Sequence, residues 1–352
     1  MPPNPTSPPI HIHALWRTGS TYTWNAFKMA SDHLRCYFEP FHHSLIKSRN
    51  ELIRDFEIAS DKFDLAFMKD NYYRNYGTTK NGVPQYQWQF SVDDYVLMPE
   101  DEHPAILSYL QRLTELANDN NQRPVMQFNR APFRAKWLKK HFQSTDIYIT
   151  RNPIDMMKSY QKLSSNRLNY YMSCYLGIIQ RYSNHPLFQE MAEYLNLKRL
   201  EADSFMHHLR SHSAPTFNAL PEGKANEILV FFWTLSLLNA TQYAEFTLDM
   251  ELADQENSPN IAAQFQDNIR SITSINVDFS DLHPQKYSDF RVIPISSEAA
   301  TIIQRAVQLI DPDWRQFENM PLAGNTRKQV EHSLNTLPHV GKVFSGIGTE
   351  PF

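Results

Sequence analysis

The sequence predicts an α/β fold, with a central parallel sheet flanked by helices, in a single domain with insertions. Short apolar, β-branched runs alternate with longer runs of helical spacing, which is the pattern of right-handed strand–helix–strand crossovers. The first strand leads through a short hydroxyl-rich turn into a helix, a P-loop-like arrangement. With 352 residues, of which 41% are hydrophobic, the chain is long enough to bury the core of such a domain.

Each element follows from the spacing of its apolar residues and from the prolines that bound it. Pro40 is expected to end the second strand, and Pro153 stands in a first helical turn, which tolerates it. Strands are predicted where apolar residues run together, at residues 9–15, 34–38, 124–128, 146–150 and 245–250. Amphipathic or apolar spacing predicts helices over residues 22–33, 48–68, 103–118, 135–142, 152–182, 228–243, 259–275 and 297–310.

The predicted α/β domain extends from residue 10 to residue 320. Within it, residues 71–95 are dense in Tyr, Trp, Asn and Gly without periodicity, which is typical of a long structured insertion. Residues 1–9 are rich in proline and predict a disordered leader, and residues 321–352 predict a loop-like tail.

Composition narrows the partners and the compartment. A net charge of −4 argues against a nucleic-acid or anionic-membrane partner. The two cysteines, Cys36 and Cys174, cannot form a framework of several disulfides, although one disulfide stays open. No apolar run reaches the roughly 20 residues of a membrane span, and the start lacks the pattern of a signal peptide. A cytoplasmic protein without a transmembrane segment is therefore expected.

The turn after the first strand, Arg17-Thr-Gly-Ser-Thr21, predicts an anion site. The N-terminus of the following helix offers unpaired N–H groups and partial positive charge, and Gly19 lets the main chain approach a ligand. A nucleoside-triphosphatase loop would need Gly in place of Ala14 and Lys directly after Gly19, and the chain has neither.

A second motif follows the predicted strand at 146–150. It reads Arg151-Asn-Pro-Ile-Asp155, with Ser159 eight residues after the arginine. The two motifs, in this order and each after a strand, resemble those of sulfotransferases that use 3′-phosphoadenosine 5′-phosphosulfate (PAPS). The segments 125–130 and 137–141 between them resemble the carbohydrate-directed branch of that family. The resemblance covers roughly residues 10 to 175 and continues more weakly to about 310.

The resemblance implies that PAPS is the co-substrate, that no metal is required, and that Arg17 stabilises the leaving phosphate. Surface exposure of Arg17, helix capping by the hydroxyls and a salt bridge of Arg151 with Asp155 are the structural alternatives. The same resemblance assigns the 5′ phosphate to Arg17, Thr18, Gly19, Ser20 and Thr21, the adenine to Tyr22, the 3′ phosphate to Arg151 and Ser159, and a closing basic cluster to Arg327 and Lys328.

The general base is a separate question. Phenol- and steroid-directed members carry Lys-Thr-His on the strand at 124–128, where this chain has Gln127, Phe128 and Asn129. The catalytic histidine is therefore missing. Glu39, just after the second strand, resembles the base of glycan- and protein-directed members, with His42 in reserve. Aromatic neighbours would raise the pKa of Glu39 toward the range of a base, unless its carboxylate is exposed.

Gln127 stands where phenol- and steroid-directed members have a lysine. Either Arg130 or a lysine of the 137–141 segment can supply the missing positive charge, and the sequence does not distinguish them. His43 is expected to be solvated. Ser20 lacks the G-x-S-x-G elbow of an esterase nucleophile. His11 and His13 share one face of a strand, but no third ligand follows at zinc-site spacing, so core or edge histidines explain them more economically.

The predicted function is a PAPS-dependent sulfotransferase with Glu39 as base, acting on a hydroxyl of a carbohydrate or glycolipid. A small hydrophobic alcohol is the alternative acceptor. A non-catalytic nucleotide-binding protein on this scaffold and a P-loop kinase are the alternative functions. Sugar stacking is expected from the rings of the insertion, which stand beside amides. These rings are Tyr72, Tyr73, Tyr76, Tyr86, Trp88, Phe90 and Tyr95.

Overall fold

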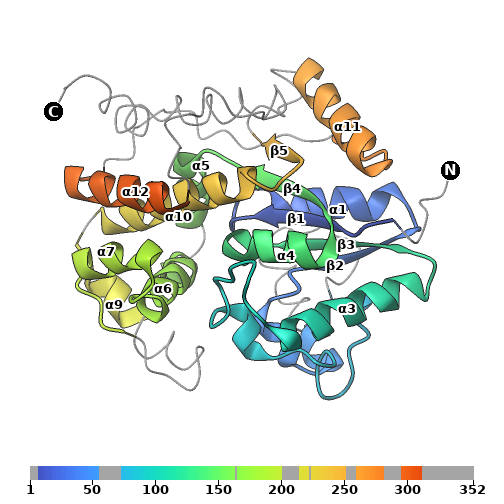
Figure 1. Cartoon of the computed structure of the whole chain (residues 1–352), viewed down its shortest axis with the longest axis horizontal. Helices are drawn as coiled ribbons and strands as arrows, with labels where there is room; N and C mark the ends of the chain where they lie inside the picture. The colour runs from blue at the N-terminus through green and yellow to red at the C-terminus, as the bar shows by residue number, and fades with distance from the viewer. Residues whose placement is uncertain are drawn as a thin grey trace. The chain divides into compact units, whose positions relative to one another are not determined.

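A computed structural model describes residues 7–54, 73–162, 165–199, 214–221, 223–250, 259–280 and 295–310. The chain divides into two compact units (Figure 1). The first contains residues 1–150 and 243–284, and the second contains residues 151–242 and 285–352.

A five-stranded, all-parallel sheet forms the centre of the first unit, with the strand order β2-β3-β1-β4-β5. Its central strand β1 pairs through Ile12 with Gln127 on one side and with Ile147 on the other. The sheet confirms the predicted α/β class. Its strands are β1 (Ile10–Ala14), β2 (Leu34–Phe38), β3 (Arg123–Phe128), β4 (Thr145–Thr150) and β5 (Phe246–Asp249).

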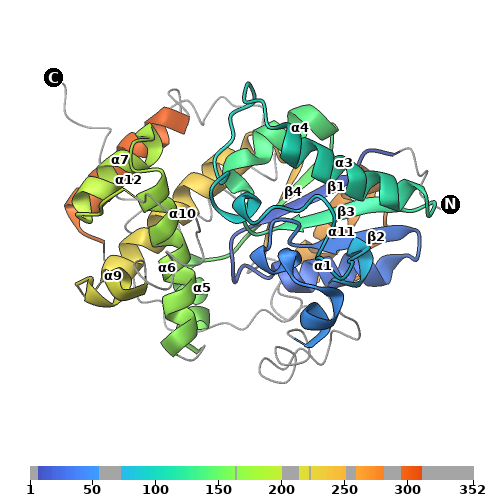
Figure 2. The same ribbon diagram turned by 90° about the horizontal axis from the view of Figure 1, so that it is seen from below.

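Helices cover both faces of this sheet, because strand side chains alternate between the faces. Val125 of β3 belongs to a core cluster with α1 (Ser20–Ala30) and α11 (Pro259–Thr273). Its neighbour Met126 belongs to a second cluster with α3 (Pro104–Asn118) and α4 (Ala135–Phe142). Figure 2 shows the strands between α1 on one side and α3 and α4 on the other.

Residues 39–54 and 73–103, the described part of the chain between β2 and α3, contain short 3₁₀ turns and contribute side chains to the second core cluster. Tyr76, Tyr86 and Phe90 belong to this cluster, together with Tyr109 of α3. The described part of the predicted insertion, residues 73–95, is therefore a folded extension of the core. The 3₁₀ turns of the first unit are η1 (His43–Ile46), η2 (Arg74–Tyr76), η3 (Trp88–Ser91) and η4 (Pro132–Arg134).

The second unit is helical in its described residues. The single helix predicted at 152–182 is two helices, α5 and α6, and the sequence did not predict α7 and α9. The apolar α10 packs against α5, α6 and α12, which explains why it lacks a polar face. None of the described helices combines the length and hydropathy needed to cross a membrane. The helices are α5 (Pro153–Lys162), α6 (Ser165–Arg181), α7 (Pro186–Tyr194), α9 (Ala214–Ala219), α10 (Lys224–Thr241) and α12 (Ser297–Ile310).

The strand order creates a switch point between β1 and β3. From β1 the chain continues into α1 on one face of the sheet, and from β3 it continues into α4 on the other face. In open parallel sheets, ligands bind outside the carboxyl ends of the strands where the connections diverge in this way. The carboxyl ends of β1, β3 and the neighbouring β2 are therefore where a site is expected.

Candidate functional site

The turn after β1 is shaped by two residues in the left-handed region. Arg17 has φ 69° and Gly19 has φ 94°. A Cβ atom on Gly19 would also lie 2.5 Å from Cε of Met250, so glycine is favoured here on two grounds. Gly19 is the N-cap of α1, which begins without a side-chain cap. Gly19 has no side chain that could cap the first turn of α1, and an uncapped helix N-terminus is the arrangement that an anion site uses.

The side chains of this turn differ in what they offer. Arg17 is exposed, and Thr21 is half-buried. Thr18 is fully buried, and its hydroxyl donates to the carbonyl of Leu15 at 2.8 Å. The Thr18 side chain therefore stabilises the turn, and only its backbone N–H fits the predicted phosphate contact. Ser20 is buried as well.

Tyr22, the predicted adenine contact, is half-buried on the core cluster of α1. Its ring centroid lies 6.0 Å from that of Phe279. Part of the Tyr22 ring is thus engaged in packing.

Glu39 lies directly after β2, in the left-handed region with φ 48°. Its N–H donates to the carbonyl of Gln127 at 2.8 Å, which extends the pairing of β2 with β3 by one residue. Its carbonyl accepts from the N–H of His42 at 2.8 Å. The residue is only 5% exposed, so its carboxylate is not the solvated strand-end group of the structural alternative.

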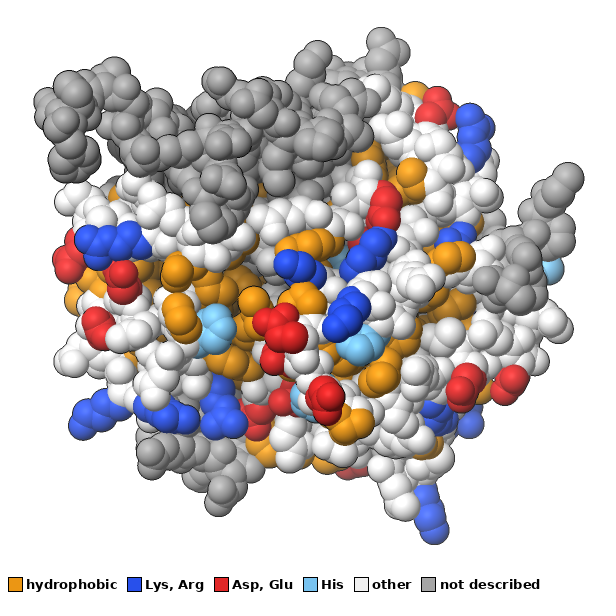
Figure 3. All heavy atoms as spheres, in the orientation of Figure 1, with side chains coloured by type: hydrophobic (Ala, Val, Ile, Leu, Met, Phe, Trp, Pro, Cys, Tyr) orange, Lys and Arg blue, Asp and Glu red, His pale blue; other side chains and the backbone are white. Residues whose placement is uncertain are grey.

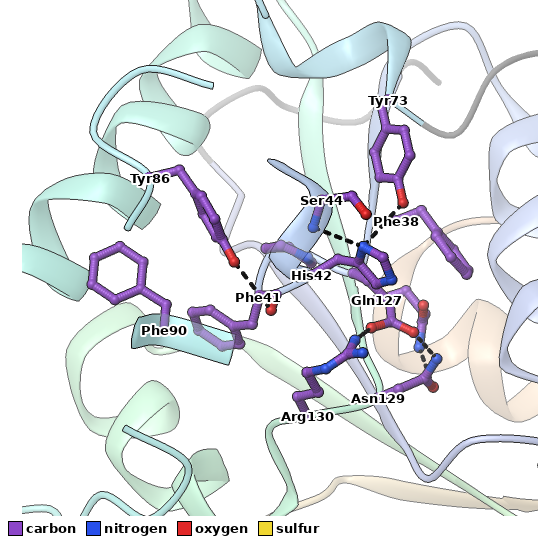
Figure 4. Close-up of polar contacts among 12 residues, drawn as sticks. Phe38, Phe41, His42, Ser44, Tyr73, Tyr86, Phe90, Gln127, Asn129 and Arg130 are labelled. Atoms are coloured by element: carbon purple, nitrogen blue, oxygen red, sulfur yellow. Dashed lines mark hydrogen bonds and ion pairs between the residues drawn. The ribbon is translucent and has the colours of Figure 1, made fainter. Parts of the chain in front are cut away.

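The two residues that follow β3, which Figure 4 labels beside Gln127, contact both carboxylate oxygens of Glu39. Arg130 forms an ion pair with Oε2, and the amide of Asn129 donates to Oε1. The amide of Gln127 donates to Oδ1 of Asn129 at 2.9 Å and so orients it. The Arg130 guanidinium also lies 4.9 Å from the ring centroid of Trp16, which precedes the turn after β1. The carboxyl ends of β1, β2 and β3 thus meet around one buried carboxylate.

The two cations left open by the sequence are separated by these contacts. Arg130 is beside Glu39, whereas Lys139 pairs with Asp146 and Glu245. Lys140 donates to the carbonyl of Pro99 at 2.7 Å. Of these candidates, Arg130 is the one placed at the carboxyl edge of the sheet.

The protonation of Glu39 is set by opposing effects. Burial raises the pKa of its carboxyl, while the Arg130 charge and the hydrogen bonds from Asn129 and Trp16 work against that rise. Each carboxylate oxygen has two lone pairs, so Glu39 can still accept a hydrogen bond from a substrate hydroxyl. A desolvated carboxylate held in this way has the chemistry of a general base.

His42, the reserve base, is half-buried near Glu39 in the chain. Its Nδ1 accepts from the N–H of Ser44 at 3.2 Å and lies 3.3 Å from the hydroxyl of Tyr73 (Figure 4). Its ring stacks on that of His43, with centroids 4.4 Å apart, so His43 is packed as well as partly solvated. Burial, with the nearby His43 and Arg130, holds the pKa of His42 well below its usual range. The imidazole is therefore neutral near pH 7.

Three tyrosine hydroxyls hold the backbone that carries Glu39. Tyr76 donates to the carbonyl of Phe38 at 2.7 Å. Tyr109 donates to the carbonyl of Pro40 at 2.9 Å, and Tyr86 to that of Phe41 at 3.5 Å. Burial raises the pKa of each of these hydroxyls, so they remain donors across the working pH range.

These contacts change the interpretation of the aromatic insertion. Tyr76, Phe90 and Tyr95 are completely buried, and Tyr86 nearly so. Their rings are core, and the expectation that they stack on a sugar is wrong. Tyr73 and Trp88 are half-buried and retain surface for a ligand, and Tyr72 lies outside the described residues.

The predicted 3′ phosphate contacts belong to the second unit. Arg151 is half-buried, and its carbonyl accepts from Nε1 of Trp233 at 2.9 Å. Ser159 is buried on α5. Arg17 belongs to the first unit, so the two groups of predicted nucleotide contacts are in different units. Arg327 and Lys328 lie outside the described residues.

Sequence reasoning missed one group of polar residues. His11 and His13 do not stand alone in the core, because Asp146 of β4 lies beside both. Asp146 comes from a neighbouring strand, so the spacing of residues along the chain could not reveal that it lies beside the two histidines. The available signal was the aspartate at the head of the apolar run 146–150.

Comparisons of the chain with protein-family models, with curated proteins and with solved structures gave no match.

Proposed function

We propose that this protein is a PAPS-dependent sulfotransferase that acts on an acceptor hydroxyl, with Glu39 as the general base. The observation that carries the proposal is the buried carboxylate of Glu39, which Arg130 and Asn129 hold at the carboxyl edge of the sheet. Trp16 links this carboxylate to the turn at Arg17–Thr21. A base and an anion site at one edge are what sulfuryl transfer needs.

The nucleotide part of the proposal rests on the turn and on α1. The N–H groups at the start of α1 bind the 5′ phosphate of PAPS, and Arg17 neutralises charge on the leaving phosphate. Ser20 and Thr21 add hydroxyl donors, and Tyr22 contacts the adenine. The family resemblance makes Arg151 and Ser159 the proposed contacts of the 3′ phosphate and adds the basic cluster Arg327 and Lys328, which lies outside the described residues. The transfer itself requires no metal ion.

The chemical step balances as follows. The acceptor oxygen forms a bond to sulfur, and its proton moves to Glu39. The bond between sulfur and the bridging oxygen breaks, and its electron pair leaves with adenosine 3′,5′-bisphosphate. Arg130, fixed between Glu39 and Trp16, stabilises charge on the sulfuryl oxygens. His42 takes the role of base if Glu39 serves only to fix Arg130.

We propose a carbohydrate or glycolipid as the acceptor and the cytoplasm as the compartment. Tyr73 and Trp88 offer partly exposed rings for a sugar face. Cys36 is a buried free thiol, as is common in a reducing compartment, and burial raises its pKa to about 12. On the face in Figure 3, positive and negative side chains are interspersed.

The deciding experiment is an acceptor screen with PAPS, read by mass spectrometry as a gain of about 80 Da for each sulfo group, which reports the transferred group itself. Saccharides and glycolipids are expected to be sulfated. Phenols or sterols as the products would reject the carbohydrate acceptor and keep the sulfotransferase.

Nucleotide binding separates the alternatives. Adenosine 3′,5′-bisphosphate should raise the melting temperature, and adenosine monophosphate much less, because only the first carries a 3′ phosphate. Equal shifts would reject the 3′ phosphate site. Binding without transfer to any acceptor would indicate the non-catalytic protein, and a response that needs both ATP and Mg²⁺ would indicate the kinase.

A further inference from the structure

The second group of interest is His11, His13 and Asp146, which lies within the sheet. The register of β1 with β4 places His11 opposite Asp146, and His13 follows two residues later on the same face. All three side chains are at most 1% exposed. Oδ1 of Asp146 lies 2.8 Å from Nε2 of His13 and 3.6 Å from Nδ1 of His11.

Aromatic rings enclose this group. The ring of Phe128 lies 5.3 Å from that of His11 and 5.7 Å from that of His13, measured between centroids. Phe142 lies 5.7 Å from His11. Glu39 follows the carboxyl end of β2, whereas His11 and Asp146 stand near the amino ends of their strands and His13 is the fourth of the five residues of β1. The group shares no residue with the proposed transfer site.

Its hydrogen bonding is incomplete. Both ring nitrogens of His11 and Nδ1 of His13 are buried and have no hydrogen-bond partner. A buried polar atom without a partner costs free energy, and such atoms are rare in folded proteins. Two imidazoles that converge on one carboxylate oxygen, with lone pairs left over, are an arrangement that a cation would complete.

We propose that His11, His13 and Asp146 bind one transition-metal ion, zinc in the first place, which links β1 to β4. Two imidazoles and a carboxylate are a zinc donor set, whereas Mg²⁺ and Ca²⁺ favour oxygen ligands alone. The three ligand atoms lie within 4.8 Å of one another. In a tetrahedron with bonds of about 2.1 Å, neighbouring ligand atoms are about 3.4 Å apart, so the required adjustment is small.

The nearest positive charge leaves room for this ion. Nζ of Lys139 lies 3.1 Å from Oδ2 of Asp146, whereas both histidines approach Oδ1. Lys139 is also held by Glu245 and by the carbonyl of Ser144, so it has partners besides Asp146. Oδ2 also accepts a hydrogen bond from Oγ of Ser144 at 2.9 Å, so the fourth ligand is proposed to be a water molecule. Burial lowers the pKa of His11, which favours the neutral imidazole that binds metal.

The test uses the full chain, which is stripped with EDTA, dialysed, given ZnCl₂ and dialysed a second time. We expect one zinc ion per chain to remain after the second dialysis, with a rise in melting temperature of roughly 3 °C or more. X-ray absorption at the zinc edge should give two imidazoles and oxygen ligands at about 2.0–2.1 Å. Loss of all zinc on dialysis would overturn the proposal, and so would a spectrum without two imidazoles.

Variants separate this site from the neighbouring half-buried histidines His42 and His43. Asp146→Asn should lose the retained zinc, whereas the double variant His42→Gln/His43→Gln should keep it. The opposite pattern would place the ion at His42 and His43 and overturn the proposal. If Asp146→Asn fails to fold, two other measurements test the proposal. These are the X-ray absorption spectrum of the unaltered chain and the zinc retained by the double variant.

Discussion

Arg130 and Glu39 form an ion pair in which the arginine is 2% exposed and the glutamate 5%. The pair joins the residue after β2 to the second residue after β3, at the edge where the connections of the sheet diverge. A charge pair in a core needs a reason, because replacing both partners by apolar groups is often neutral or stabilising. Catalysis at Glu39 is the reason that we propose.

The first prediction concerns Glu39 itself. Glu39→Gln keeps the shape and the packing but removes the proton acceptor, so transfer should fall by about 10²–10⁴-fold while nucleotide affinity is unchanged. The matched control is Glu51→Gln, on an exposed carboxylate bonded to Ser48. Binding is measured by calorimetry and transfer by mass spectrometry. Full transfer activity in Glu39→Gln would move the role of base to His42.

The second prediction concerns the energetics of the ion pair. Arg130→Met leaves Glu39 charged and unpaired, which should lower the free energy of unfolding by about 3–5 kcal/mol. The double variant Arg130→Met/Glu39→Gln should recover part of that loss. Urea unfolding of the unaltered protein, the two single variants and the double variant gives the coupling energy between the two side chains. A loss in the double variant equal to the sum of the losses in the two single variants would mean that the two side chains do not interact.

The third prediction uses two glycines with similar backbone angles. Gly19→Ala meets both a strained φ of 94° and the Met250 side chain, whereas Gly223→Ala meets a φ of 89° and has nothing within 4 Å of the new Cβ. Both should lose roughly 1–2 kcal/mol of stability from the backbone. The Gly19 variant should lose more and should also bind adenosine 3′,5′-bisphosphate more weakly.

Thermal or urea unfolding with calorimetry checks this pair. If the Gly223 variant lost nucleotide affinity to the same extent, the turn after β1 would not be the phosphate site.

The fourth prediction concerns stability and pH. Burial lowers the folded-state pKa of His11 and of His42, so the unfolded chain takes up protons first as pH falls. The stability that these histidines contribute is present above their unfolded pKa of about 6.5 and is lost below it. Each group adds a slope of at most about 1.4 kcal/mol per pH unit. His42→Gln should reduce the slope between pH 7 and 5.5, measured by urea unfolding in EDTA, and an unchanged slope would contradict the assignment.

The fifth prediction concerns the acceptor. Trp88→Ala removes a half-buried ring and should weaken acceptor binding by about 1 kcal/mol, with nucleotide binding unchanged. Phe90→Ala, two residues later, removes a fully buried ring and should cost about 3–5 kcal/mol of stability. Acceptor KM and urea unfolding distinguish the two effects. A loss of nucleotide affinity in Trp88→Ala would argue against an acceptor contact.

The sequence predicted the local elements well, because their signals are local. β2 and α4 lie where the apolar runs and their boundaries placed them, and α12 likewise. The strand order was not available in this way, since it depends on which apolar faces meet in the folded chain. The contact of Arg130 with Glu39 requires β2 to pair with β3, and the contact of His11 with Asp146 requires β1 to pair with β4.

The aromatic segment shows a second limit. A ring beside amides has the same sequence signature whether it faces a ligand or the core. Tyr76 and Tyr86 face the core, where their hydroxyls donate to the carbonyls of Phe38 and Phe41. These partners are 38 and 45 residues away along the chain, so the local sequence does not reveal them. Composition therefore located the segment correctly and assigned most of its rings to the wrong environment.

The three phenols that hold the Glu39 backbone have a consequence for engineering. Under the proposed function, segment 73–95 is the place to alter acceptor choice, and it also fixes the backbone beside the Glu39 carboxylate through Tyr76 and Tyr86. A foreign loop grafted here would change the acceptor specificity, but it would also remove the hydrogen bonds that hold the backbone beside Glu39. Redesign of the acceptor preference should therefore proceed by point changes at Tyr73 and Trp88, with the buried tyrosines left in place.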